Sequence, residues 1–222
     1  MTIVDWPLSL IPLNIAIRPP RKTASMNESL TGFTQAVPVI RPPFGVTVEF
    51  DAIEGDDVLT WRALVGALEG RGNVLRLPLF DHWFNDPAAA LGFRTSFADG
   101  SFFSDGSAFV ISDIVGVVAS GTQGDRTLSI DFGPYGRALQ AGFYFGLGEE
   151  PYLATSVTWA GTVATVRITP SLRRTAPSVA VRLRPTLLCQ LKDDDSGELL
   201  LRNLRWSTPA LDLVEVPLGL LS

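Results

Sequence analysis

The sequence predicts a mainly β protein: a β-sandwich with one α-helix, plus an inserted small β-barrel or sandwich domain. Short segments alternate apolar and polar residues, which is the period of a half-buried strand. One segment spaces its apolar residues by three and four positions, which is the helical period. In the back half, turns such as Gly-Pro, Gly-Glu-Glu-Pro and Ala-Gly recur between short strands, as in small sandwiches and barrels.

The front of the chain is expected to form strands separated by prolines. Apolar residues alternate over 11–17 and again over 44–50. A Pro-Pro pair ends the first of these strands, because proline cannot donate a hydrogen bond to a neighbouring strand. Residues 21–29 are polar and are expected to form a loop, after which a strand resumes at 37–40.

The helix is expected to begin at Asp56 or Asp57, since a carboxylate there can accept the free N–H groups of the first turn. Gly70 and Gly72 supply its stop, and a strand follows at 73–80. One helix among strands in this order is typical of a β-sandwich or of an α+β unit whose helix covers one sheet face. Trp61 is the main anchor of the apolar stripe, which consists of Val58, Trp61, Leu64, Val65 and Leu68.

The composition changes near residue 85, and this change indicates two domains. The first combines residues 1–84 with 198–222, and the second, residues 85–197, is an inserted peripheral β domain. The last two strands need the front sheet as a partner, because an isolated hairpin is marginally stable in water. The strands expected after residue 85 are 108–119, 127–132, 141–147, 152–159, 163–169, 179–189, 199–206 and 211–216.

The side chains available for catalysis argue against an enzyme. His82 is the only histidine, so a Ser-His-Asp or Cys-His mechanism would have to use it, and no Gly-x-Ser-x-Gly elbow is present. Beside Asp81 and among aromatic residues, it is expected to be half-buried at a strand end. Cys189 is the only cysteine, which excludes an internal disulfide and, with one histidine, the usual zinc sites. We expect no catalytic residue, no cofactor and no metal, with Cys189 a buried apolar filler.

Two acidic segments could carry acid–base chemistry, but both have the composition of turns. Glu149-Glu150 precedes a proline, and Asp193-Asp194-Asp195 precedes Ser-Gly. The Gly-Leu-Gly at 146–148 lacks the following helix and the lysine of a phosphate-binding loop.

The charge balance limits the possible partners. A net charge of −5 disfavours nucleic-acid recognition. Sixteen of the 18 basic residues are arginine, the residue of fixed interface pairs, which indicates a subunit that hides surface in an assembly. No stretch reaches about 18 uncharged apolar residues and the start lacks a basic region, so we expect neither membrane insertion nor a signal peptide. A small basic cluster is expected to pair with an acidic loop or a partner subunit; it comprises Arg173, Arg174, Arg182 and Arg184.

An ordered set of motifs covers most of the chain. Residues 27–35 read NESLTGFTQ, and the helix and its stop carry WRAL at 61–64 and LEGRG at 68–72. In the back half, residues 139–148 read LQAGFYFGLG and residues 164–173 read ATVRITPSLR. In this order the motifs resemble those of the distal tail protein family, the tail-tip (baseplate) proteins of long-tailed, siphovirus-like phages.

This resemblance implies a structural virion protein rather than an enzyme. Such a protein forms a ring, here expected to be a homohexamer, that joins the tail tube to the baseplate hub and other tail-tip proteins. It would be assembled in the host cytoplasm and reside at the tail tip of the virion. Residues 1–20, 21–35 and 217–222 are expected to be arms that pair with neighbours, or ordinary termini and loops. The candidate packing and interface residues are Trp61, Leu64, Leu68, Phe33, Gln35 and Arg71.

A second interpretation is a carbohydrate- or receptor-binding β module of the tail tip. Aromatic faces stack on sugars, although a buried or subunit-facing aromatic cluster is commoner. The oligomeric state discriminates the two interpretations. The aromatic-rich stretch that favours this second one contains Trp83, Phe84, Phe93, Phe97, Phe102 and Phe103.

Overall fold

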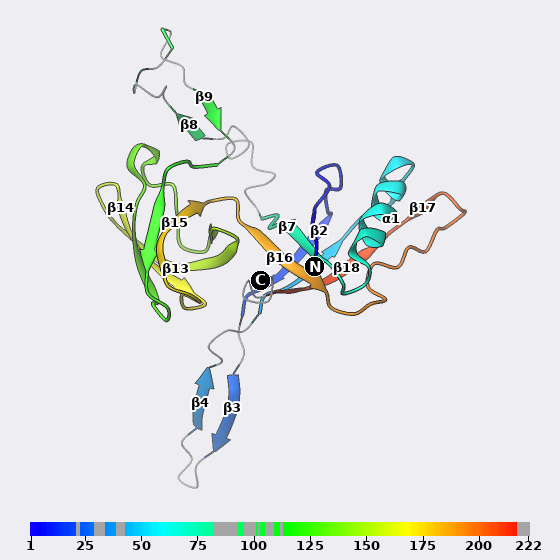
Figure 1. Cartoon of the computed structure of the whole chain (residues 1–222), viewed down its shortest axis with the longest axis horizontal. Helices are drawn as coiled ribbons and strands as arrows, with labels where there is room; N and C mark the ends of the chain where they lie inside the picture. Colours follow the sequence, from blue (N-terminus) through cyan, green and yellow to red (C-terminus); the bar gives the residue numbers. More distant parts are fainter. Residues whose placement is uncertain are drawn as a thin grey trace. The chain divides into compact units, whose positions relative to one another are not determined.

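The protein is mainly β, as the sequence predicts (Figure 1). It divides into two compact units: Met1–Pro78 with Leu187–Ser222, and Leu79–Thr186. Both divisions come earlier in the chain than the boundaries expected near residues 84 and 197. That each unit folds by itself stays a prediction. The computed structural model describes residues 1–20, 23–28, 34–38, 43–81, 93–95, 101, 103–104, 109–111 and 113–216.

The first unit contains a six-stranded sheet in the order β1-β7-β16-β18-β5-β2. β1 pairs in parallel with β7, whereas β5 pairs antiparallel with both β2 and β18. β1 and β2 are paired within this sheet, as in an ordinary ordered terminus, and pairing with a neighbouring copy stays a prediction for these two segments. The strand bounds are β1 Ile3–Asp5, β2 Asn14–Arg18, β5 Gly45–Glu49, β7 Val74–Pro78, β16 Thr186–Leu191 and β18 Ala210–Glu215.

Alternation along β5 and β18 places apolar side chains on one face of this sheet. Leu211 lies opposite Val48 and Leu213 opposite Val46, and all four side chains are buried. The residues between them face the other way, where Arg18 forms an ion pair with Asp212 at 3.5 Å. The period-two pattern predicted for 44–50 is therefore the pattern of a strand with one buried face.

The helix α1 spans Asp56–Leu68 and buries Val58, Trp61, Leu64 and Leu68. The expected carboxylate cap is wrong, because Gly55 occupies the N-cap with φ 60° and ψ −127°, and no side chain caps the helix. The N-cap therefore lies one residue before Asp56, because glycine readily adopts the positive φ of this position. Both aspartates therefore lie in the first turn, where negative charge still interacts favourably with the helix dipole. At the other end Glu69 takes the left-handed cap position, directly before Gly70.

Three two-stranded sheets accompany the larger elements: β3 Thr23–Glu28 with β4 Thr34–Pro38, β6 Ile53–Glu54 with β17 Trp206–Ser207, and β8 Phe93–Thr95 with β9 Phe109–Ile111. The expected loop at 21–29 is wrong for the residues of β3, which form a strand because β4 pairs with them. The expected strand at 199–206 is also wrong, since a tight turn occupies 202–205 and only Trp206 enters β17.

The second unit is a closed barrel in the order β10-β11-β14-β13-β12-β15. Closure leaves its core inside the strands, where Ile130, Phe145, Tyr152 and Val166 are fully buried. A short 3-10 helix, η2 Gly133–Tyr135, follows β11. The barrel strands are β10 Val118–Gly121, β11 Thr127–Asp131, β12 Tyr144–Leu147, β13 Glu150–Ala160, β14 Val163–Thr169 and β15 Ala176–Arg182.

The strand expected at 179–189 is two strands that serve different units. β15 closes the barrel, and β16 belongs to the six-stranded sheet of the first unit. The break falls at residues 183–185, where Pro185 lacks the N–H needed to continue a ladder. The carboxylate of Asp113 accepts hydrogen bonds from the N–H groups of Leu183 and Arg184 at 2.9 and 3.1 Å.

Candidate interaction surface

The segment before β2 is folded back on itself by a buried tryptophan. The Trp6 indole N–H donates to the carbonyl of Leu10 at 2.8 Å, and the Trp6 ring stacks on Phe50 with centroids 6.0 Å apart. Phe50 in turn meets Trp61 of α1 edge-on at 5.1 Å. This aromatic row connects the segment that precedes β2 to the end of β5 and to the middle of α1.

Folding back in this way turns three large apolar side chains outward. Leu8, Ile11 and Leu13, here called the N-terminal rim, are all exposed, whereas Leu10 between them is buried. The N–H of Leu13 donates to the carbonyl of Glu49 at 2.9 Å, which holds the rim's end against β5. Exposed apolar residues that lie together mark interaction surfaces more often than scattered ones do.

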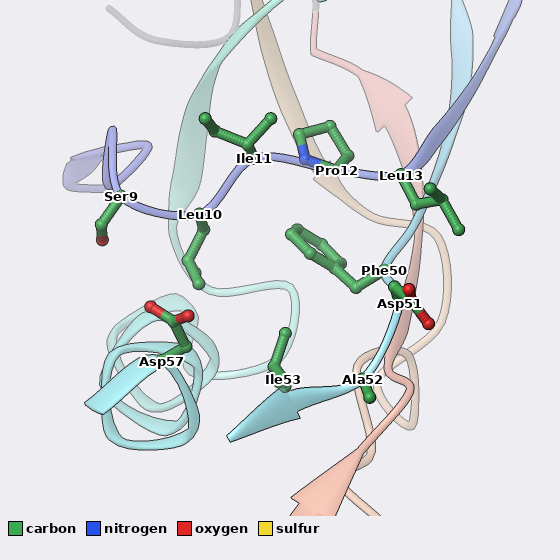
Figure 2. A pocket seen from close by; sticks show the side chains of 10 residues that line it. All are labelled: Ser9, Leu10, Ile11, Pro12, Leu13, Phe50, Asp51, Ala52, Ile53 and Asp57. Atoms are coloured by element: carbon green, nitrogen blue, oxygen red, sulfur yellow. The ribbon is translucent and has the colours of Figure 1, made fainter. Parts of the chain in front are cut away.

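Two residues of the rim, Ile11 and Leu13, belong to the lining of a hollow of about 300 Å³ (Figure 2). Figure 2 shows Leu10, Phe50 and Ile53 pointing toward one another across it, so its floor is apolar. The hollow lies between the N-terminal segment, the residues after β5 and the start of α1. Its lining residues are Ser9, Leu10, Ile11, Pro12, Leu13, Phe50, Asp51, Ala52, Ile53 and Asp57.

Two aspartates belong to the lining of the hollow. Asp57 lies beside its floor, whereas the carboxylate of Asp51 points away from Leu10, Phe50 and Ile53. Within the described part of the chain, neither forms an ion pair, and Asp51 is exposed. The hollow therefore combines apolar side chains at its floor with one carboxylate beside them.

The sequence-predicted packing residues of the helix lie in the core of the first unit. Trp61, Leu64 and Leu68 are buried, and the Trp61 indole N–H donates to the carbonyl of Gly197 at 3.0 Å. Arg71 is exposed and contributes its backbone: its carbonyl accepts from the Gln190 side chain at 2.9 Å.

Several predicted residues lie outside what the structure describes. Phe33 and His82 fall outside the described residues, and Gln35 lies in β4 opposite Asn27 with its side chain not described. Most of the aromatic-rich stretch is outside as well, although Phe103 is described and exposed.

Cys189 lies on β16 and is buried. Its Sγ donates a weak hydrogen bond to the carbonyl of Leu75 at 3.5 Å. Burial, and secondarily the negative charge of Glu215, raises the pKa of this thiol well above its usual range. A thiol held protonated in this way is a poor nucleophile and a poor metal ligand.

The acidic pair Glu149-Glu150 meets the basic cluster within the second unit. Glu150 is buried and accepts from the Tyr152 hydroxyl at 3.1 Å, with Arg174 Nε 3.5 Å from the same carboxylate. Glu149 has Arg182 Nη1 at 4.0 Å. Burial, and then Glu150, raises the pKa of Tyr152 above its usual range. Arg174 and Arg182 are therefore paired within the chain, which is one of the two pairings expected for the basic cluster.

No group of three metal-ligating side chains occurs among the described residues. No helix in the described ranges is long and apolar enough to span a bilayer. No protein-family model matches the chain, and a search of curated proteins finds no relative.

The sequence reasoning missed the hollow and its border. Trp6 and Leu10 are four residues apart. The spacing of apolar residues does not show whether the chain between them is extended or folded back. The available signal was the run of large apolar residues around Pro7 and Pro12, which exceeds what one short strand can bury.

Proposed function

We propose that this chain is a structural subunit of a phage-like tail tip, a distal tail protein that assembles into a ring between tail tube and baseplate hub. The ordered motifs of the sequence support the family, and six copies is the number that the resemblance implies. The ring is the functional unit, and the chain performs no reaction in it.

The N-terminal rim and the hollow beside it carry this proposal. Soluble monomers rarely expose contiguous apolar patches, and an apolar surface with a charged border is typical of protein–protein contacts. Ring formation would cover the rim in every subunit.

The ends of the six-stranded sheet give a second line of support. Among the described strands, β1 and β2 each have one strand neighbour. Edge strands present unpaired N–H and C=O groups, which a neighbouring subunit can approach. Contacts between two different surfaces close into rings when the rotation between copies repeats to a full turn.

The test is the mass of the purified chain by sedimentation velocity over a wide concentration range, alone and with a tail-tube protein, together with negative-stain images. We expect rings. A chain that remains monomeric under all these conditions contradicts the proposal, and glycan binding by that monomer would favour the receptor-binding alternative.

A matched pair of variants then tests the surface. Ile11→Asp places a charge in the rim and is expected to weaken assembly by about tenfold or more, as for a central interface residue. Leu59→Asp is the control, since Leu59 is 61% exposed against 57% for Ile11 but lies on the outer face of α1. Equal assembly of the two variants would exclude the rim from the interface.

A further inference from the structure

We propose that the hollow receives the turn around Leu204 of a neighbouring copy. This inference rests on the proposed ring and names the contact that builds it. The Leu204 turn comprises residues Arg202–Arg205, and both it and the hollow belong to the first unit.

The Leu204 turn is tight and well closed. The N–H of Arg205 donates to the carbonyl of Arg202 at 3.1 Å, and Arg202 also bridges to Trp206. Both central residues have positive φ, 51° at Asn203 and 57° at Leu204, which type I′ turns require. The turn therefore projects Leu204 at its tip.

Leucine is an unfavourable residue for this position. Asparagine and glycine adopt positive φ readily, whereas a bulky side chain there is strained. Leu204 is also 89% exposed, so packing within its own copy does not compensate for the strain. An exposed apolar side chain held in a strained conformation points to a role outside the monomer.

One flank of the turn complements the hollow in charge. Arg202 stacks over the Trp206 ring at 5.3 Å, and Arg205 Nε donates to Glu54 at 3.1 Å. Glu54 neutralises Arg205 within its own copy, whereas Arg202 forms no ion pair among the described residues and keeps its N–H donors for a partner. Asp57 borders the hollow, so a leucine entering it brings Arg202 toward a carboxylate.

The hollow and the turn are different surfaces of one subunit. Each copy would therefore give its turn to one neighbour and receive the turn of another. A contact of this heterologous kind produces rings if it closes. Trp206 pairs with Glu54 of β6, and Glu54 is next to Ile53, which lines the hollow. The turn and the hollow are therefore connected through β6 in each copy.

Leu204→Asn tests the inference, with Leu200→Asn as its control. Asparagine suits positive φ, so the variant is expected to melt no lower than the parent at a concentration where the parent is dissociated. Its assembly is expected to be weaker by about tenfold or more. Leu200 is 69% exposed in the same loop but outside the turn, and its variant is expected to form rings like the parent.

A mixing experiment tests the direction of the contact. Leu204→Asn keeps an intact hollow, and Ile11→Asp keeps an intact turn. At a concentration where a contact weakened tenfold no longer closes rings, neither variant is expected to form rings alone. An equimolar mixture is then expected to form one-to-one pairs, because each pair contains one intact contact. Native mass spectrometry distinguishes these pairs from rings and monomers.

The outcomes separate this inference from the proposed function. Rings formed by Leu204→Asn at the parent's concentrations would overturn the inference and leave the ring proposal standing. A mixture without pairs would also overturn it. A parent chain that never assembles would overturn both.

Discussion

Trp61 connects three parts of the first unit through one side chain. Its ring meets Phe50, its indole N–H reaches the carbonyl of Gly197, and it is fully buried. Gly197 has φ 91°, and a Cβ there would come within 2.9 Å of the Leu211 side chain. The close approach of the turn after β16 to the helix therefore depends on glycine at 197 and on tryptophan at 61.

We expect Trp61→Ala to lower the free energy of unfolding by about 3–5 kcal/mol, the usual cost of removing a large buried aromatic side chain. Urea denaturation of the purified chain measures it. Trp61→Phe is the matched control, because it keeps an aromatic ring and loses the hydrogen bond to Gly197, and it should cost clearly less. Equal midpoints for Trp61→Ala and the parent would show that α1 does not depend on this anchor.

Cys189 should behave as an inert core residue. Its raised pKa keeps the thiol protonated at neutral and mildly alkaline pH, and reagents cannot reach it without opening of the sheet. We expect slow labelling of the native chain and one rapid equivalent in denaturant. A Leu200→Cys variant, whose new thiol would be exposed, supplies the fast reference rate; native labelling of Cys189 at that rate would contradict this account.

Elements with a clean local period are predictable from sequence. The strand at 163–169 has the expected bounds, and the helix stripe has its buried residues where the spacing of three and four places them. The period carries this information because each of these elements has one buried face.

Elements defined by distant partners are not predictable in the same way. β3 is polar in sequence and forms a strand because β4 pairs with it, and the segment at 179–189 looks continuous although Pro185 separates strands of two units. The hollow depends on Trp6, Phe50 and Trp61 meeting, residues that are far apart along the chain. The positive φ of Leu204 runs against the residue's own preference, so composition gives no signal for it.

The loop before β10 and the segment after β15 are joined through one carboxylate. Asp113 accepts hydrogen bonds from the N–H groups of Ile114, Leu183 and Arg184 at 2.7, 2.9 and 3.1 Å. Removing an acceptor leaves partly buried donors unsatisfied, at a cost of about 1–3 kcal/mol.

We therefore expect Asp113→Ala to loosen this end of the barrel. Hydrogen exchange followed by mass spectrometry should show faster exchange in peptides covering 113–121 and 176–186, with peptides of the first unit unchanged. Asp113→Asn keeps one acceptor and should fall between the alanine variant and the parent. Unchanged exchange in both peptides would mean that the loop is held by its apolar contacts alone.

At the scale of the whole molecule, the chain enters and leaves the second unit at adjacent points. The N–H of Leu79 donates to the carbonyl of Pro185 at 3.0 Å, so the two crossings lie side by side. Closely spaced ends are what make the insertion of one unit into another tolerable. The first unit keeps its complete sheet and helix without the intervening residues, because β16 and β18 return to it after the barrel.

The two units should fold independently of one another. A variant that lacks residues 79–186, with Pro78 joined to Leu187 by a short Gly-Ser linker, is expected to fold, because every strand of its sheet remains and the linker spans neighbouring chain ends. Since it keeps both the hollow and the Leu204 turn, it should also assemble as the parent does. Circular dichroism, thermal melting and sedimentation measure these properties, with residues 79–186 expressed alone as the companion piece. If both pieces are unfolded, the chain is one cooperative domain; if the first piece folds but never assembles, the barrel contributes to the ring.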